Sequence, residues 1–149
     1  IGGPAVAGIP VTHRDHASSV SFVTGHEDPT KDESAVDWDA LAATGGTIVV
    51  LMGVGKLPDY TAALREAGMA PETPVALVER ATWPDQRVAT GTLATAVEAR
   101  DAVGIEPPAI TVIGEVAGER GDVVEFLRGY GGDAPEASES DDPDGVSEQ

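Results

Sequence analysis

Three short apolar runs constrain the fold of this chain more than any other feature of its sequence. The runs are Thr47–Met52, Pro74–Val78 and Ala109–Ile113. Each is continuously apolar rather than alternating, which is typical of strands that are buried on both faces of a sheet. Because segments with helical patterning separate the runs, the sequence predicts an α/β domain built on a largely buried sheet.

Capping residues place two of the helices that should cover this sheet. Asp37 is a suitable N-cap for a short helix over Asp37–Ala43, and Thr92 is expected to cap a helix over Leu93–Val103. The other expected elements are a helix over Leu57–Ala67, strands over Ser19–Gly25 and Gln86–Thr90, a polar loop over Glu27–Ala35 and a last helix over about Gly121–Arg128.

The charge of the chain excludes several classes of partner. It carries 26 acidic and nine basic residues, for a net charge of −17. Such a surface repels nucleic acid and anionic membranes, and no apolar run approaches the length of about 20 residues that a membrane span needs. Cysteine is absent, which excludes disulfides and thiolate ligands. The composition is typical of a cytoplasmic protein of a halophile, because high salt screens exposed charge.

The three predicted buried strands end in a similar way. They run into Met52-Gly53-Val54-Gly55, Arg80-Ala81-Thr82 and Gly114-Glu115-Val116. In open α/β sheets ligands bind beyond the carboxyl ends of strands, where small residues let the backbone approach a ligand closely. Glycine also ends strands where no ligand binds, so that explanation stays open. The polar loop Thr82–Arg87 is either a ligand contact or a plain hairpin connection.

A compact polar cluster, Thr12-His13-Arg14-Asp15-His16, lies near the start of the chain. His13 and His16 could chelate a metal, but no third ligand stands at a suitable spacing. The guanidinium of Arg14 suits an anionic ligand, because it forms paired hydrogen bonds with a carboxylate. The alternative is a surface ion pair between Arg14 and Asp15 or another neighbouring carboxylate.

Several segments together resemble the tetrapyrrole methylases, in particular the carboxyl-terminal part of those that act on uroporphyrinogen III. The resemblance covers about residues 2–128, with the segments in the family's order. They are Gly8-Ile9-Pro10-Val11-Thr12-His13-Arg14-Asp15, Phe22-Val23-Thr24-Gly25-His26, Val50-Leu51-Met52-Gly53, Gly68-Met69, Thr73–Glu79, Gln86-Arg87-Val88, Gly91-Thr92-Leu93 and Pro108–Val116.

The resemblance implies the carboxyl-terminal α/β domain of the two-domain fold of these enzymes, with a mixed sheet flanked by helices. It also implies a methyl transfer from S-adenosyl-L-methionine. The implied reaction converts uroporphyrinogen III to precorrin-2, on the way to sirohaem and cobalamin, in a cytoplasmic homodimer. The implied cofactor contacts are Met52, Gly53, Ala81, Thr82, Pro74 and Ala76. The implied substrate contacts are Arg14, Thr12 and His13, with Arg14 holding substrate carboxylates.

The resemblance also implies a division of the protein into parts. Residues 1–15 are expected to form an inter-domain junction, residues 16–130 the family's carboxyl-terminal domain and residues 131–149 a disordered acidic tail. The amino-terminal domain, with the family's Gly-Pro-Gly-Asp-type loop and the catalytic residues, is expected to precede Ile1. Two positions depart from the family pattern, since Leu51 replaces an aromatic residue and Ala81 replaces a frequent glycine.

Two other functions stay open on the sequence alone. One keeps the fold and changes the substrate, as in another precorrin methylase or a diphthine synthase. The other is a non-catalytic acidic interaction domain, because fold does not determine function. The Thr12-His13-Arg14 and Gln86-Arg87-Val88 segments favour uroporphyrinogen III as the substrate, and the composition favours a haloarchaeal source.

Overall fold

A five-stranded mixed sheet forms the centre of the protein, as a computed structural model describes it for residues 1–25 and 35–121. The strands are β1 (Val20–Thr24), β2 (Thr47–Leu51), β3 (Pro74–Glu79), β4 (Arg87–Thr92) and β5 (Ala109–Ile113). Their order across the sheet is β1-β2-β5-β3-β4. The β1–β2 pair is parallel, whereas β5 runs antiparallel to both β2 and β3, and β4 runs antiparallel to β3. The predicted mixed α/β architecture is confirmed.

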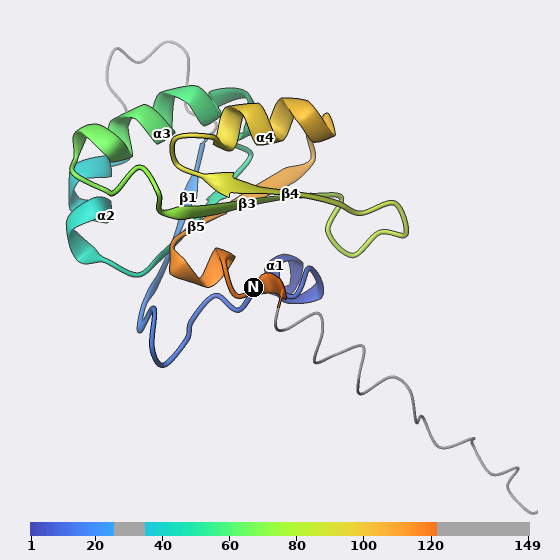
Figure 1. Cartoon of the computed structure of the whole chain (residues 1–149), viewed down its shortest axis with the longest axis horizontal. Helices are drawn as coiled ribbons and strands as arrows, with labels where there is room; N and C mark the ends of the chain where they lie inside the picture. The colour runs from blue at the N-terminus through green and yellow to red at the C-terminus, as the bar shows by residue number, and fades with distance from the viewer. Residues whose placement is uncertain (26–34, 122–149) are drawn as a thin grey trace, which may run out of the picture.

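Helices cover both faces of this sheet, as Figure 1 shows. One face carries α2 (Trp38–Thr44), α3 (Leu57–Glu66) and α4 (Ala96–Val103). The opposite face carries the short α1 (Gly2–Val6) and the 3₁₀ turn η2 (Glu115–Ala117). A second 3₁₀ turn, η1 (Val54–Lys56), leads from β2 into α3. Within the described ranges no helix is long and apolar enough to cross a membrane.

The apolar runs of the sequence are continuous because the central strands bury both of their faces. In β3, Val75 and Leu77 pack into the core beneath the three helices, whereas Ala76 and Val78 pack into the core on the opposite face. The second core also contains Ala7, so the first residues of the chain pack on the sheet. The alternation of side chains along a strand thus divides one apolar run between two cores.

The two capping predictions have different outcomes. Asp37 caps α2 as expected, since its Oδ1 accepts a hydrogen bond of 2.9 Å from the Ala40 N–H. The prediction for Thr92 is wrong, because Thr92 is the last residue of β4 and pairs with Pro74. The Thr92 N–H donates to Oγ1 of Thr95 at 3.0 Å, and α4 begins only after that turn.

Three further predictions fall mainly outside the described residues. These are the polar loop over Glu27–Ala35, the helix over about Gly121–Arg128 and the acidic tail. The remaining predicted elements are confirmed with small shifts of their ends, and the short strand expected over Gln86–Thr90 extends to Thr92.

Candidate functional site

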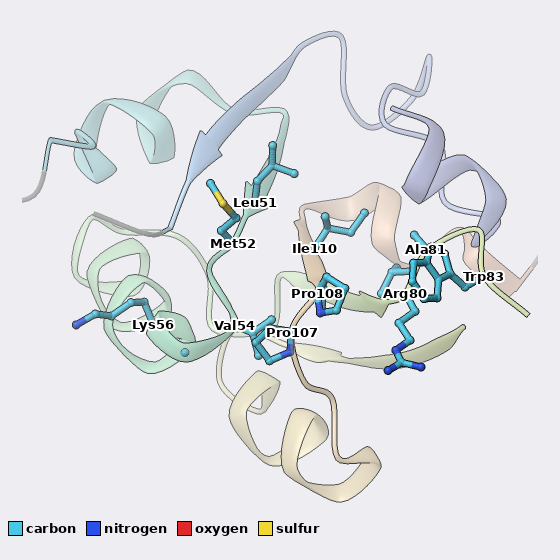
Figure 2. A pocket seen from close by; sticks show the side chains of 13 residues that line it. Leu51, Met52, Val54, Lys56, Arg80, Ala81, Trp83, Pro107, Pro108 and Ile110 are labelled. Atoms are coloured by element: carbon cyan, nitrogen blue, oxygen red, sulfur yellow. The ribbon is translucent and has the colours of Figure 1, made fainter. Parts of the chain in front are cut away.

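A large pocket lies at the edge of the sheet where β2 and β3 end and β5 begins. Its volume is about 1130 Å³. Figure 2 shows Leu51 and Met52 on one side, Arg80, Ala81 and Trp83 on the other, and Pro107, Pro108 and Ile110 between them. The lining residues are Leu51, Met52, Val54, Gly55, Lys56, Val78, Arg80, Ala81, Trp83, Pro107, Pro108, Ala109 and Ile110. Most of them are apolar, which suits the flat and apolar parts of a small organic ligand.

Two of the three strand ends noted in the sequence border the pocket. The turns after β2 and β3 line it, through residues such as Met52 and Ala81. The third strand end, Gly114-Glu115-Val116, does not line the pocket, because β5 runs antiparallel to its neighbours and ends on the opposite side. The start of β5 and the preceding Pro107–Pro108 segment take that place.

Three non-glycine residues at this edge adopt left-handed backbone conformations. The φ angles are 54° at Met52, 46° at Arg80 and 79° at Thr82. Side chains with a Cβ rarely adopt such angles, and a β-branched residue like Thr82 does so least readily. Strain of this kind persists where the surrounding structure imposes it, and it is frequent at ligand sites. The strained residues all lie in the two turns that border the pocket.

Two backbone donors beside the pocket lack a partner in the part of the chain that the structure describes. The Met52 and Ala81 N–H groups donate to no oxygen there, whereas their neighbours Arg80 and Thr82 donate to Pro108 and Gln86. Unsatisfied backbone donors at a cavity are suited to polar atoms of a ligand.

Glycine allows close contact of the backbone behind the first of these turns. A Cβ on Gly53 would lie 2.6 Å from Cγ1 of Val50 and 3.2 Å from Cε1 of Tyr60. A Cβ on Gly25, at the end of β1, would overlap Cα of Gly53. The Met52 turn therefore rests directly on the core, so its position is set by packing rather than by the loop alone.

The cationic side chains at the pocket are already paired. Nζ of Lys56 lies 3.2 Å from a carboxylate oxygen of Asp59, and Arg80 forms an ion pair with Asp85. The Arg80 guanidinium also lies 5.6 Å from the centre of the Trp83 ring. The contacts of Arg80 fix the ring of Trp83, which lies in the connection between β3 and β4 and lines the pocket. The predicted loop after β3 is thus both a hairpin connection and a wall of the pocket.

The three predicted substrate contacts line a second, smaller cavity of about 300 Å³. Thr12, His13 and Arg14 lie there together with Ala17 and Ser18, and none of these residues belongs to the larger pocket. Arg14 is exposed and makes no hydrogen bond or ion pair within the described residues, so the predicted alternative of a surface pair is not seen there.

The two histidines beside Arg14 make contacts of their own. The His13 and His16 rings stack with their centres 4.8 Å apart. Nε2 of His16 lies 2.9 Å from a carboxylate oxygen of Glu119, which ties this loop to the segment after η2. Residues 1–25 and 35–121 contain no group of three or more potential metal ligands.

The six predicted cofactor contacts do not all lie at the larger pocket. Met52 and Ala81 line it, and Gly53 and Thr82 stand next to lining residues. Pro74 lies at the opposite end of β3, and Ala76 is fully buried in the second core, so neither reaches the pocket. The reason is the length of β3, which separates its first residues from the turn at its end.

Sequence reasoning missed part of the pocket. It treated Pro107–Pro108 only as a flank of the last strand, and it gave no role to Lys56 or Ile110. The direction of β5 in the sheet was the missing information, because an apolar run reads the same for a parallel and an antiparallel strand.

Comparisons with known proteins identify the family of this chain. The family model described as Tetrapyrrole (Corrin/Porphyrin) Methylases matches residues 1–97. The S-adenosyl-L-methionine-dependent uroporphyrinogen III methyltransferase of Methanosarcina barkeri is 55% identical over 78 aligned residues, covering 44% of this chain and 31% of that protein. The uroporphyrinogen-III C-methyltransferase of Synechocystis is 44% identical over 116 residues, covering 78% of this chain and 44% of that protein.

A solved structure is similar as well. The uroporphyrin-III C-methyltransferase of Thermus thermophilus, complexed with S-adenosyl homocysteine, is 33% identical with a TM-score of 0.62. The match covers 74% of this chain and 48% of that one. The chain thus spans less than half the length of these relatives. Because the family model matches more than half of the residues, this chain belongs to the tetrapyrrole methylase family.

Proposed function

We propose that this chain takes part in the S-adenosyl-L-methionine-dependent C-methylation of uroporphyrinogen III to precorrin-2, on the way to sirohaem and cobalamin. The observation that carries the proposal is the larger pocket, where two strained turns place the Met52 and Ala81 N–H groups, which have no partner among the described residues, beside an apolar wall. The similarity of this chain to enzymes named for this reaction also supports the proposal.

The residues of the pocket fit the proposed cofactor. The N–H groups of Met52 and Ala81 would hold polar atoms of the cofactor, and the apolar wall would enclose its adenosine. Bound there, S-adenosyl-L-methionine would supply a methyl group on a sulfonium, which is transferred by in-line displacement. The task of this chain's residues is therefore to fix the position of the donor and to exclude water.

The smaller cavity is the proposed contact with the substrate. Uroporphyrinogen III is rich in carboxylates, and the guanidinium of Arg14 has no partner among the described residues, which leaves it free to bind one. Thr12 and His13 line the same cavity and would add polar contacts. We do not assign a proton-transfer residue within this chain.

The proposal includes a second domain. The relatives are more than twice as long as their matched parts, and we propose that an amino-terminal domain supplies the rest of the cofactor site and the catalytic residues. We further propose that the complete enzyme acts as a homodimer. This chain alone should therefore bind S-adenosyl-L-methionine weakly, and tight binding in calorimetry would contradict the division of the site.

The proposal is tested with the full-length protein that carries this chain, assayed for transfer of a radiolabelled methyl group to uroporphyrinogen III. High salt is used because of the net charge of −17. We expect label in the tetrapyrrole, and loss of that transfer in Ala81→Leu, whose larger side chain would fill the pocket. The control is Ala94→Leu, at an exposed position outside the pocket. Absence of label transfer from the wild-type protein would refute the proposed reaction.

A further inference from the structure

A charged side chain lies buried behind the wall of the larger pocket. Glu79 is the last residue of β3 and is only 4% exposed. It does not line the pocket, although its neighbours Val78 and Arg80 do. Burial of a carboxylate is costly unless the charge is paired and hydrogen-bonded, so the partners of Glu79 indicate why it is there.

Arg87, at the start of β4, is the first of these partners. Its Nη2 donates to both carboxylate oxygens of Glu79, at 2.9 and 2.7 Å. The same guanidinium donates to the carbonyl of Val103 at 3.1 Å and to that of Gly104 at 2.8 Å. These carbonyls belong to the carboxyl end of α4, where helices leave acceptors unsatisfied. Arg87 therefore joins β3, β4 and the end of α4.

The second partner of Glu79 leads directly to the pocket. The N–H of Glu106 donates to Oε2 of Glu79 at 3.0 Å. Proline has no N–H, so this is the last backbone donor before the Pro107–Pro108 segment, which lines the pocket. On the far side of that segment, the Arg80 N–H donates to the carbonyl of Pro108 at 2.9 Å. These two hydrogen bonds fix both ends of the segment to the end of β3.

The electrostatics of the pair agree with this geometry. Hydrogen bonds from Arg87, and next the one from the Glu106 N–H, hold the pKa of Glu79 below its usual value. The hydrogen bonds to Glu79 raise the pKa of Arg87 in turn. Both groups therefore stay charged at neutral pH, and the carboxylate keeps its acceptor capacity for Glu106.

We propose that Glu79 and Arg87 form a clamp that positions the Pro107–Pro108 wall of the pocket for cofactor binding. The two side chains touch no ligand themselves. They set the position of this segment relative to the end of β3, to which it is hydrogen-bonded in the wall of the pocket. This role rests on the proposed function, since it assumes that S-adenosyl-L-methionine occupies this pocket.

Loss of the clamp should weaken cofactor binding by more than a loss of stability alone would explain. In the full-length protein, Glu79→Gln and Arg87→Met should each raise the Kd for S-adenosyl homocysteine about tenfold or more, because small displacements of positioning groups are costly. Arg87→Lys keeps the charge but cannot bridge the carboxylate and both carbonyls, so it should give a smaller rise. The KM for S-adenosyl-L-methionine should rise by a larger factor than kcat falls.

A matched control separates positioning from stability. Ile113→Val removes one methyl group from the core at the opposite end of β5, so it lowers the Tm without touching the pocket. Calorimetry should give the control an unchanged Kd. If the clamp variants lower the Tm as the control does and keep the wild-type Kd, the proposal is overturned.

Amide hydrogen exchange gives a readout that does not depend on the cofactor. In Arg87→Met, exchange at Glu106 and Arg80 should accelerate relative to the rest of the sheet, and in Ile113→Val it should not. Unchanged exchange at both amides would overturn the clamp by itself. Failure of the wild-type protein to bind S-adenosyl homocysteine would instead refute the proposed function, so the two failures are distinguishable.

Discussion

Oη of Tyr60 donates a hydrogen bond of 2.9 Å to Oγ1 of Thr111, which joins α3 to the central strand β5 inside the core. Both residues are almost fully buried. The Tyr60 ring also lies directly beneath Gly53, in the turn that carries Met52 to the larger pocket. A buried hydrogen bond therefore fixes the ring on which this turn packs. The conformation of the turn thus depends on the core.

Removal of one member of this pair should destabilise the fold. Tyr60→Phe leaves Oγ1 of Thr111 without its partner in a site that water does not reach, at a cost of about 1–3 kcal/mol. Denaturant unfolding measures this loss. The double variant Tyr60→Phe/Thr111→Val removes both polar groups and should recover much of the stability. If the two single losses simply add in the double variant, the hydrogen bond does not couple the residues.

Alkaline pH should destabilise the protein through the same tyrosine. Burial raises the pKa of Tyr60 from 10.0 to about 12, against smaller opposing effects of the Thr111 hydrogen bond and Arg100. Between about pH 10 and pH 12 the unfolded chain releases this proton and the folded protein keeps it, so stability falls as the pH rises. The loss over this range should reach about 2–3 kcal/mol.

The alkaline effect can be assigned by comparing unfolding curves at several pH values. Tyr60→Phe should flatten the decline above pH 10, because phenylalanine has no proton to release. A decline of the same slope in the variant would mean that other groups cause it.

Gly53 should tolerate no side chain. Its φ of −107° is ordinary, so the obstacle is the 2.6 Å approach of a Cβ to Cγ1 of Val50 rather than backbone strain. Gly53→Ala should cost about 1–3 kcal/mol in thermal or denaturant unfolding, as other overpacked sites do. Gly55→Ala, two residues along and with open space around its Cβ, should stay within about 0.5 kcal/mol of the wild type. Equal effects of the two changes would contradict the close packing around Gly53.

Arg14 should act on the substrate and not on the cofactor. In the full-length protein Arg14→Ala should raise the KM for uroporphyrinogen III about tenfold, since a charged hydrogen bond to a carboxylate is lost. The Kd for S-adenosyl homocysteine should not change, because Arg14 lines a different cavity from Met52. Arg65→Ala removes the same charge from the exposed surface of α3 and controls for long-range electrostatics. An equal loss of both affinities would refute the role of Arg14.

Local signals in the sequence were sufficient for most of the elements. Strands β2, β3 and β5 were predicted from their apolar runs, which are continuous because each strand is buried on both faces. The N-cap of α2 was predicted because Asp37 bonds within its own turn. The cap predicted at Thr92 was wrong because a threonine suits both a helix cap and a strand end. Its pairing with Pro74, a long-range contact, decided between them.

The site was less predictable than the fold. Met52 and Ala81 were identified through the family resemblance, and their backbone geometry is visible only in three dimensions. The Pro107–Pro108 wall depends on the antiparallel direction of β5. The Glu79–Arg87 pair joins residues eight apart in the sequence, on two strands whose register the sequence does not reveal.

A crystal structure of the full-length protein with S-adenosyl homocysteine would show whether the larger pocket holds the cofactor. We expect the ligand to lie in this pocket, with polar atoms at hydrogen-bond distance from the N–H groups of Met52 and Ala81 and with its adenosine against the apolar wall. A ligand bound elsewhere, with these two N–H groups facing solvent, would contradict this expectation.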